Sequence, residues 1–356
     1  MRSEKGRGTV ILRRTGGAAA ALLLAASLAQ AQGRDTLILT STNDSTNSVA
    51  VFKLNTSGTP SLSLVAMLPT GGAGGSAGGG AGALQFSQDL GAVANYGSNT
   101  VTQLARVSNS ILVSGTINLA TNCVQPISTA LTENHLFVVG SNCAESHTWP
   151  SGDVDHVVAL TDSSAAQIAT GTTWAAVTLK SGSVLKLPLA QKGGLQGTST
   201  DIALPEDANN TPLGEAFWGD LLAINPAHSA DSFALLNSQG MVYPVAGPQP
   251  AYPSNAPCWL VKGSGNIWYS GNSPAQAISV FFSDSQGGAF YKNVALPGMP
   301  TDITISADGQ WLAVIYTATD GAHIGVFSID SHGDLAPVAT SSAVGVSAFD
   351  GVAFSQ

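Results

Sequence analysis

The amino-acid sequence predicts an all-β fold, a seven-bladed β-propeller, and three observations lead to it. Short stretches such as residues 48–54 and 277–282 alternate apolar with polar or small residues, the pattern of half-buried strands bounded by turn residues. Helical periodicity is almost absent. Groups of strands recur every 37 to 45 residues, the length of a blade in repeats of the WD40 type.

The repeated unit is clearest at residues 84–104 and 303–329. Each contains a strand, a Ser-x-Asp turn, a second strand, a loop of small polar residues and a third strand. The same order recurs at 258–280 and, more weakly, at 128–139 and 221–236. Seven units follow, at residues 36–68, 82–117, 123–168, 170–204, 214–250, 256–296 and 299–339.

The two ends of the repeat predict how the ring closes. The first unit starts at residues 36–40 with a second-strand pattern and lacks an inner strand, whereas residues 348–354 read as an inner strand without followers. We expect this C-terminal strand to pair into the first blade, because closure removes the open sheet edges that promote aggregation.

Residues 1–31 have the features of a cleaved signal peptide: a basic start, an apolar run at 18–29 and an Ala-Gln-Ala cleavage site ending at Ala31. The apolar run has 12 residues, whereas a bilayer span needs about 20, so we expect no stable membrane anchor and a secreted or periplasmic protein. No linker divides residues 32–356, which we expect to form a single domain with the glycine-rich stretch 71–82 as a long internal loop.

Charge excludes two classes of partner. The first 31 residues hold five of the 13 basic and one of the 22 acidic residues, so the rest of the chain has 8 and 21, a formal charge of −13. Nucleic acid and anionic membrane surfaces both require cations that this chain lacks. A small molecule or a protein at the propeller face is the expected partner of a monomer.

Three cysteines fall in the exported part: Cys123, Cys143 and Cys258. The first two follow Asn in similar contexts and lie twenty residues apart, so we expect a Cys123–Cys143 disulfide in an oxidising compartment. The alternative is three buried thiols that act as small apolar residues.

Three motifs resemble the secreted seven-bladed lactonase family, whose members include 6-phosphogluconolactonase and the fungal carboxymuconate cyclase. They are Asn-Tyr-Gly-Ser-Asn-Thr-Val at 95–101, Asn-Ala-Pro-Cys-Trp at 255–259 and the Ser-Ala-Asp-Gly turn at 306–309. The match is good over residues 256–356 and fair over 82–140. The resemblance implies the same propeller fold.

The resemblance also implies a difference in activity. Catalytic members of the family bind acidic substrates through Arg and His, including a Gly-Pro-Arg-His motif on one inner strand. The corresponding residues 213–218 contain neither, and after residue 31 the only arginines are Arg34 and Arg106. Because a phosphorylated or dicarboxylate sugar acid needs cationic, preferably bidentate recognition, we expect phosphogluconolactonase activity to be absent.

Three carboxylates are the candidate catalytic residues. Propeller topology places Glu215, Asp302 and Asp350 near the mouth of the channel, together with Cys258 and Trp259. Converging carboxylates would be ligands for Ca²⁺ or another divalent cation, and by raising one another's pKa they would supply a general base. Separate turn-forming or solvated carboxylates are the alternative. No other cofactor is expected.

The candidate ligand-binding residues are His147, Asp153, His156, Trp218 and Trp259. The first three belong to a polar stretch that we interpret as a long loop of the third blade, with a spacing that fits no standard zinc site. The two tryptophans would offer stacking surfaces, whereas Trp268 and Trp311 are expected to pack between blades.

Two functions remain open. One is a non-catalytic propeller whose face binds a ligand or protein; the other is a hydrolase or cycloisomerase acting on a small uncharged lactone through the three carboxylates. The one Gly-x-Ser-x-Gly match, at residues 74–78, lies inside the glycine-rich stretch and not between a strand and a helix, so it does not support a serine nucleophile. The scarcity of arginine favours the binding function.

Overall fold

The computed structural model describes residues 33–75, 81–160, 162–204, 211–226, 234–239, 242–243, 257–284, 287–346 and 348–356. The chain divides into two compact units, residues 1–34 and 35–356. The predicted signal peptide lies outside the described residues. Within those residues no helix is long and apolar enough to cross a membrane, and the only helical element is one 3-10 turn at Tyr96–Ser98.

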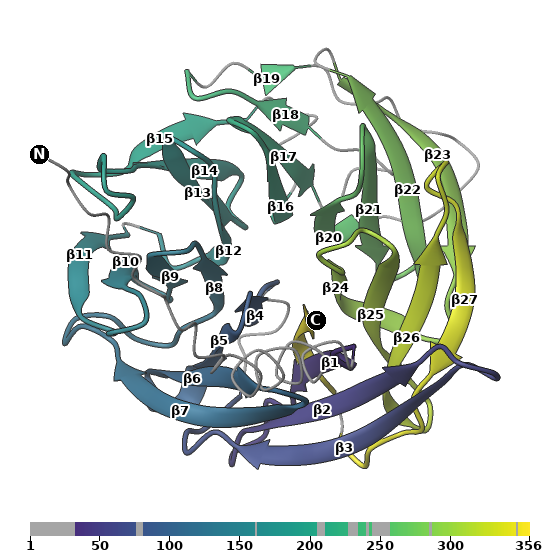
Figure 1. Cartoon of the computed structure of the whole chain (residues 1–356). Coiled ribbons are helices and arrows are strands. Elements are labelled where there is room, and N and C mark those ends of the chain that lie inside the picture. Colours follow the sequence, from purple (N-terminus) through teal and green to yellow (C-terminus); the bar gives the residue numbers. More distant parts are fainter. Residues whose placement is uncertain are drawn as a thin grey trace, which may run out of the picture. The chain divides into compact units, whose positions relative to one another are not determined.

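Residues 35–356 form seven four-stranded antiparallel sheets arranged as the blades of a ring (Figure 1), so the predicted fold class is confirmed. From the channel outward, blade 1 contains β28 (Asp350–Ser355), β1 (Thr36–Ser41), β2 (Ser48–Asn55) and β3 (Ser61–Pro69). Blade 2 contains β4 (Leu84–Ser87), β5 (Leu90–Asn95), β6 (Thr100–Val107) and β7 (Ser110–Asn118). Blade 3 contains β8 (Ser128–Leu131), β9 (His135–Val139), β10 (Cys143–Thr148) and β11 (Val154–Ala159).

The other four blades have the same order. Blade 4 contains β12 (Ala165–Thr170), β13 (Trp174–Leu179), β14 (Ser183–Pro188) and β15 (Thr200–Ala203). Blade 5 contains β16 (Pro212–Trp218), β17 (Leu221–Pro226), β18 (Ala234–Leu236) and β19 (Val242–Tyr243). Blade 6 contains β20 (Pro257–Lys262), β21 (Ile267–Asn272), β22 (Ala277–Asp284) and β23 (Gly287–Ala295), and blade 7 contains β24 (Met299–Ile305), β25 (Trp311–Ala318), β26 (Gly321–Ile329) and β27 (Leu335–Thr340).

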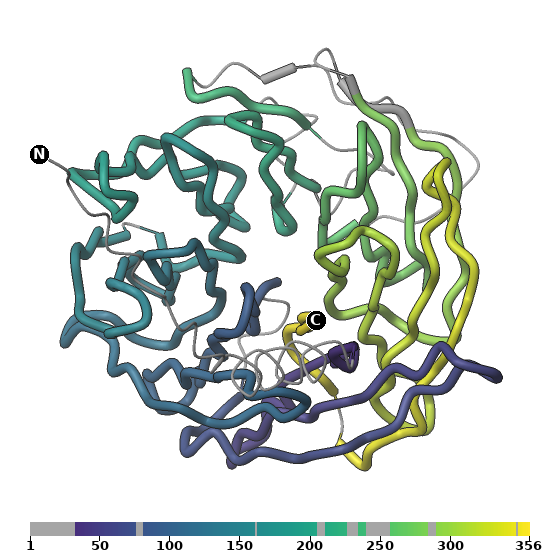
Figure 2. The backbone as a smooth tube through the Cα atoms, in the orientation of Figure 1, coloured from purple at the N-terminus to yellow at the C-terminus, as the bar shows by residue number. Residues whose placement is uncertain are grey.

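Ring closure occurs in blade 1, as predicted. Strand β28 pairs antiparallel with β1, so that Leu37 lies opposite Ser355 and Thr40 opposite Val352. The trace in Figure 2 shows the yellow C-terminal strand beside the purple first strand of the ring. A first blade built from both ends leaves no gap between blades 7 and 1.

Each blade has four antiparallel strands, so the chain returns to the same side of the ring before every inner strand. We call this side the mouth face; it carries the starts of the inner strands and the loops between second and third strands. The opposite side is the far face. Residues near the start of any inner strand therefore gather around one opening of the channel.

One blade boundary differs from the prediction. The sequence placed residues up to 168 in the third blade, but that blade ends at Ala159, and β12 is the inner strand of blade 4. The burial of the two strands explains the difference: β12 is mostly covered by its neighbours, whereas β11 is mostly exposed, as an outer strand is.

The core lies between adjacent sheets. Its largest fully buried side chains include Trp174, Trp268, Tyr269, Phe52 and Phe137. Trp268 of blade 6 is completely covered and shares an apolar cluster with Ala223 and Leu235 of blade 5, as expected for a residue between blades. Burial of such aromatic side chains contributes most of the packing energy of each blade pair.

The end of the glycine-rich stretch crosses the mouth of the channel. Gly82 donates its N–H to Asp302 Oδ2 of blade 7 at 3.3 Å, and its carbonyl accepts from Thr129 N and Oγ1 of blade 3 at 2.9 and 3.1 Å. Ala81, just before it, joins the apolar cluster of blades 6 and 7. Asp302, Gly82 and Thr129 thus connect blade 7 with blade 3, which are not neighbours in the ring.

Candidate functional site

The three predicted carboxylates all lie on inner strands: Glu215 on β16, Asp302 on β24 and Asp350 on β28. Glu215 and Asp302 are buried, whereas Asp350 is partly exposed. The structure divides them into a pair, Asp302 with Asp350, and a separate Glu215.

Asp302 is held by backbone amides. Its Oδ1 accepts from the N–H of Ile303 at 2.8 Å, and its Oδ2 accepts from Gly82 at 3.3 Å and Val352 at 3.2 Å. A bulge in the pairing of β24 with β25, between Pro300 and Asp302, interrupts the strand just before the side chain. Burial raises the pKa of Asp302 to about 7, although the three amides oppose this rise.

Asp350 is the less buried member of the pair. Burial and the negative charge of Asp302 raise the pKa of Asp350 to about 7. No described residue donates a hydrogen bond to its carboxylate. The next residue, Gly351, has φ +72°, and a Cβ there would lie 2.3 Å from Leu84 N, so only glycine allows this approach of blades 1 and 2.

Because each carboxylate of the pair has a pKa near 7, the two carry about one proton between them at neutral pH. An acceptor and a donor oxygen therefore stand together at the mouth face. This arrangement suits hydrogen bonding to hydroxyl or ammonium groups and general acid–base chemistry.

Glu215 is a buried carboxyl without hydrogen bonds. Among the described residues neither of its oxygens has a partner. Burial raises its pKa well above the ordinary value, and the amides of Ala169 and Thr178 in blade 4 only partly oppose this. Gln167 fixes the Glu215 backbone through two hydrogen bonds of 2.9 and 3.0 Å. Glu215 therefore lies beside the backbone amides of blade 4, in surroundings that oppose its ionisation.

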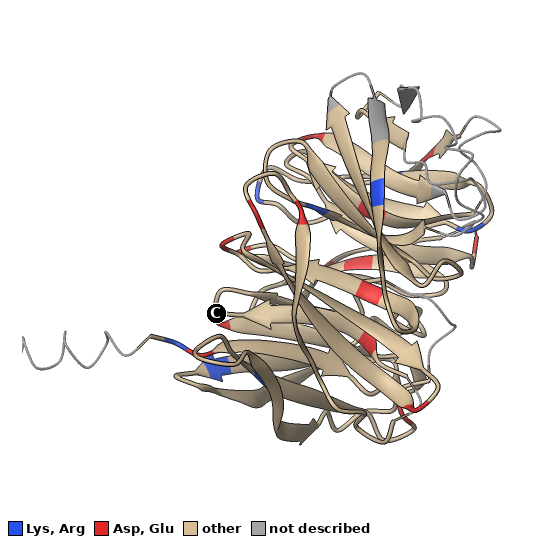
Figure 3. Ribbon diagram, turned by 90° about the vertical axis from the view of Figure 1, so that its right-hand side faces the viewer, with Lys and Arg blue, Asp and Glu red and all other residues tan. Residues whose placement is uncertain are grey.

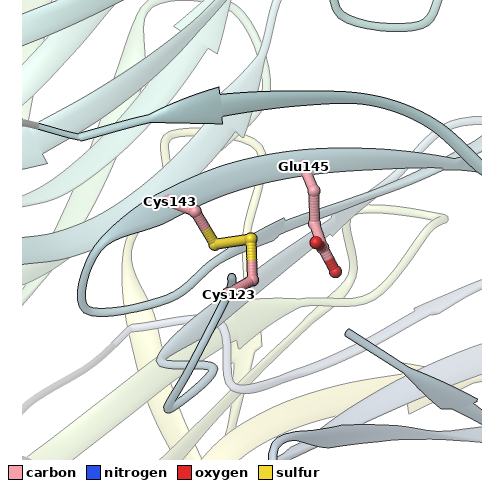
Figure 4. A group of neighbouring side chains, drawn as sticks. All are labelled: Cys123, Cys143 and Glu145. Carbon is pink, nitrogen blue, oxygen red and sulfur yellow. A yellow bond between two sulfur atoms is a disulfide. The ribbon is translucent and has the colours of Figure 1, made fainter. Parts of the chain in front are cut away.

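The prediction that the three carboxylates form one metal site is wrong. In the part of the chain that the structure describes, only one group of three potential ligand atoms lies within 4.8 Å of one another: Cys123, Cys143 and Glu145 (Figure 4). Its two sulfurs are joined in a disulfide and are not thiolates. Glu215 lies beside the amides of Ala169 and Thr178 in blade 4, which the sequence does not reveal.

The predicted disulfide is confirmed. Cys123 and Cys143 are bonded, with their Cα atoms 5.5 Å apart, and the bridge joins the loop before β8 to β10. Cys258 is buried outside the disulfide; burial raises its pKa to about 12 even though the charge of Lys180 opposes the rise. Cys258 is thus a protonated thiol at neutral pH.

The predicted polar loop of blade 3 is instead a strand hairpin, and this prediction is wrong. His147 lies in β10, completely buried, with Nε2 2.8 Å from Glu145 Oε1 and Nδ1 3.0 Å from the carbonyl of Gly152. His156 lies in β11, and Asp153 is exposed in the turn on the far face. None of these side chains lines the mouth of the channel.

The two tryptophans proposed as stacking surfaces do not meet at the mouth either. Trp259 is buried against Gly271, and its Nε1 has no partner among the described residues. Trp218 ends β16 on the far face, partly exposed, with Lys262 Nζ 5.4 Å from its ring centre. Trp259 therefore belongs to the core rather than to a binding surface.

Sequence reasoning missed the residues that shape the mouth. Gly82, Thr129 and Gly351 position the pair through backbone groups, and Gln167 holds Glu215. Of these residues, only Gly82 could have been found from the sequence, because it ends the glycine-rich stretch 71–82. Lys180, in the mouth-face loop after β13, is partly buried, and burial lowers its pKa.

The basic residues offer little to an anionic substrate. Arg106 is buried, and its guanidinium donates to Ser355 Oγ at 3.1 Å, to the carbonyl of Ser108 at 2.9 Å and to the carbonyl of Asp35 at 2.5 Å. The bonds to Ser355 and Asp35 connect β6 with blade 1. Figure 3 shows the charged residues scattered through the blades rather than gathered in one basic patch.

Comparison with known proteins supports the fold. No family model and no curated protein sequence matches the chain. The periplasmic gluconolactonase of Pseudomonas aeruginosa is 14% identical with a TM-score of 0.68, covering 91% of this chain and 99% of that one. A protein of Bacteroides fragilis, assigned provisionally as a 6-phosphogluconolactonase, is 12% identical with a TM-score of 0.68, over 92% and 99%.

The chain shares the fold of these structures, a seven-bladed propeller. A Lactobacillus plantarum protein of the same architecture is 14% identical with a TM-score of 0.67 and is covered completely. The virginiamycin B lyase of Staphylococcus aureus is more distant, with 13% identity and a TM-score of 0.56 over 74% of this chain and 85% of that chain. Because one fold carries several activities, the activity of this propeller depends on its own residues.

Proposed function

We propose that this lactonase-type propeller binds a small uncharged or cationic ligand at the mouth of its channel and lacks phosphogluconolactonase activity. The observation that carries the proposal is the Asp302–Asp350 pair, whose partly exposed member, Asp350, accepts no hydrogen bond from a described residue. Arg106, which would suit a phosphate, is engaged in holding blades together.

The ligand class follows from charge and hydrogen-bonding capacity. With about one shared proton, the pair is negative overall and offers mainly acceptor oxygens. Hydroxyl and ammonium groups donate to such oxygens, whereas a phosphate or carboxylate would meet a like charge in a region of reduced dielectric. A polyhydroxy compound or a protonated amine therefore fits the mouth.

A second candidate, hydrolysis of a neutral lactone, rests on the same pair. Asp350 would take a proton from water as the water oxygen attacks the lactone carbonyl, and the ring C–O bond would break with proton return to the leaving oxygen. A base with a pKa near 7 suits this role at neutral pH. The product carboxylate would then be repelled by the pair. The gluconolactonase among the structural neighbours adds fold analogy only.

We also propose that the protein works outside the cytoplasm. The Cys123–Cys143 disulfide suits an oxidising compartment, and a structural neighbour is periplasmic. The sequence features of residues 1–31 agree with export.

Calorimetric titration with glucono-1,5-lactone and with 6-phosphogluconate tests both candidates. The neutral lactone should bind, the phosphorylated acid should not, and Asp350→Asn should weaken binding while the matched far-face control Asp153→Asn should not. Tight binding of 6-phosphogluconate would refute the proposed ligand class. Lactone turnover that rises through pH 7 in the wild type, and is lost in Asp350→Asn, would favour the hydrolase over the binding protein.

A further inference from the structure

A buried carboxylate lies beside the disulfide of blade 3. Cys123 Sγ, Cys143 Sγ and a carboxylate oxygen of Glu145 lie within 4.8 Å of one another. Cys143 and Glu145 extend from β10, and Cys123 comes from the loop before β8, so that the three side chains converge (Figure 4). Each of the three is at most 3% exposed. Two sulfurs and a carboxylate oxygen are a ligand set that Zn²⁺, a borderline-soft cation, accepts.

The Glu145 carboxylate is held in place from two sides. The N–H of Ala120 donates to its Oε2 at 3.1 Å, and Nε2 of His147 lies 2.8 Å from its Oε1. The other ring nitrogen, Nδ1, lies 3.0 Å from the carbonyl oxygen of Gly152 and donates to it, because a carbonyl oxygen only accepts. Outer contacts of this kind orient metal ligands, and they leave lone pairs of the carboxylate for a cation.

The packing of blades 2 and 3 does not explain this polar pair. Cys123 and Cys143 belong to an apolar cluster that also contains Leu136 and Val138. A buried ionisable pair stabilises a fold no better than apolar side chains of similar volume, and often less well. A disulfide needs no carboxylate neighbour. The place of Glu145 beside the two sulfurs therefore indicates a ligand rather than a packing residue.

The charges balance when a divalent cation joins two thiolates at this position. Because Nδ1–H of His147 is bonded to Gly152, Nε2 of His147 and Oε1 of Glu145 share one proton, and the pair is neutral overall. The two negative charges of the thiolates are cancelled by the two positive charges of the cation. A site without net charge avoids the large free-energy cost of burying an unpaired ion.

We propose that Cys123, Cys143 and Glu145 bind a zinc-type divalent cation when the disulfide is reduced. A dithiol supplies two electrons and two protons, which convert the disulfide to two thiols while the dithiol itself becomes a disulfide. The cation then displaces the two thiol protons. The sulfurs move apart to about 3.8 Å, the separation of two thiolates on a tetrahedral ion with Zn–S bonds of about 2.3 Å, and a water molecule that enters with the ion is the fourth ligand.

Disulfide and cation are alternative connections between the same two segments. Each joins the loop before β8 to β10, so the two segments are held together in the oxidised and in the reduced protein. Thr121 and Asn122, which precede Cys123, are exposed, so a reductant and a cation can enter through this loop. The cation site shares no residue with the Asp302–Asp350 pair at the mouth of the channel.

Titration of the whole protein with Co²⁺, a spectroscopic substitute for Zn²⁺, tests the proposal. The protein is reduced with a dithiol, freed of the reductant without air and compared with the oxidised protein. The reduced wild type should bind one Co²⁺ per chain with the near-ultraviolet charge-transfer band of thiolate ligands, and Zn²⁺ should displace it. The oxidised protein should show no such band.

Two variants identify the ligands. Cys258→Ser removes the cysteine outside the disulfide and, once reduced, should bind Co²⁺ as the wild type does. Glu145→Gln keeps the size of the side chain but loses the carboxylate. It should bind Co²⁺ at least about 10-fold more weakly, since even the outer partners of metal ligands contribute that much to affinity. An unchanged affinity would contradict the assignment of Glu145 as a ligand.

The wild type alone gives a second measurement that does not depend on a variant's folding. A cation that binds only the folded state raises the midpoint of unfolding. Zn²⁺ should therefore raise the urea midpoint of the reduced protein and leave that of the oxidised protein unchanged. A reduced protein that shows no thiolate band with Co²⁺, or a Zn²⁺ effect of the same size in both redox states, would overturn the proposal.

Discussion

Asp302→Asn should remove a large part of the pH dependence of stability near neutrality. The pKa of Asp302 is about 7 in the folded protein, against an ordinary value of 3.8. An acid whose pKa is raised by folding contributes stability that is fully present below its unfolded pKa and is lost as the pH rises through its folded pKa. Each pH unit in that window costs about 1.4 kcal/mol, so between pH 5 and pH 7 Asp302 should weaken folding by about 3 kcal/mol.

Asparagine keeps an oxygen for the amides of Gly82 and Val352 but cannot ionise, so this loss should disappear. Removing the charge beside Asp350 should also lower the pKa of Asp350, which reduces its contribution in the same direction. Urea unfolding at pH 5, 6, 7 and 8 measures the effect. The wild type should lose stability from pH 5 to about pH 7 and change little beyond it, and the variant should change much less over the same interval.

His323 must be separated from this effect. Burial lowers its pKa, but the carbonyl of Ser341 and the carboxylate of Asp320 raise it by more. A base with a raised folded pKa also loses its stabilising effect as the pH rises through that pKa, so the comparison is made in a His323→Gln background. If Asp302→Asn retains the wild-type slope there, Asp302 is not the buried titrating group that we describe.

Three further substitutions test the supports of the ring by urea unfolding at neutral pH. Arg106→Met should cost about 3 kcal/mol, because it removes charged hydrogen bonds that join blades 1 and 2; a loss below about 0.5 kcal/mol would show that these bonds are not stabilising. Cys123→Ser should cost about 3 kcal/mol by opening a loop of 20 residues, more than the matched Cys258→Ser, and equal losses would contradict a stabilising disulfide. His147→Gln should cost about 3 kcal/mol because it disrupts a buried hydrogen bond to Glu145, and the double variant with Glu145→Gln should lose less than the sum of the two. Additive losses would show that the two side chains act independently.

The sequence predicted the fold because the repeated unit is local. Alternation identifies single strands, and turn residues place them in groups of four, so the blade number follows without knowledge of distant contacts. The strand at 350–355 was predicted to close the ring because it had no followers. The predicted boundary between blades 3 and 4 was wrong near β12. Ala165, Ala166 and Ile168 are buried, and their apolar pattern would be the same in either blade, so the sequence does not tell which blade the strand joins.

The site was predicted only in part. Topology places Asp302 and Asp350 near the mouth, because every inner strand begins on that face. The direction of each side chain depends on bulges, such as the one between Pro212 and Glu215, and a bulge leaves no pattern in a single sequence. His147 was misplaced for a related reason: a buried polar pair two residues apart on one strand looks like a polar loop when its burial is unknown.

The closure of blade 1 has a mechanical consequence. Leu37 lies opposite Ser355, so the chain enters β1 and leaves β28 at the same end of one antiparallel ladder. A force applied to the segments before β1 and after β28 would open this ladder one hydrogen bond at a time, as a zipper opens, instead of shearing all of its bonds together. The ring would then lose its innermost strand in blade 1 while the other six blades still held theirs. A tether at either of these positions would therefore pull on the β1–β28 pairing that closes the propeller.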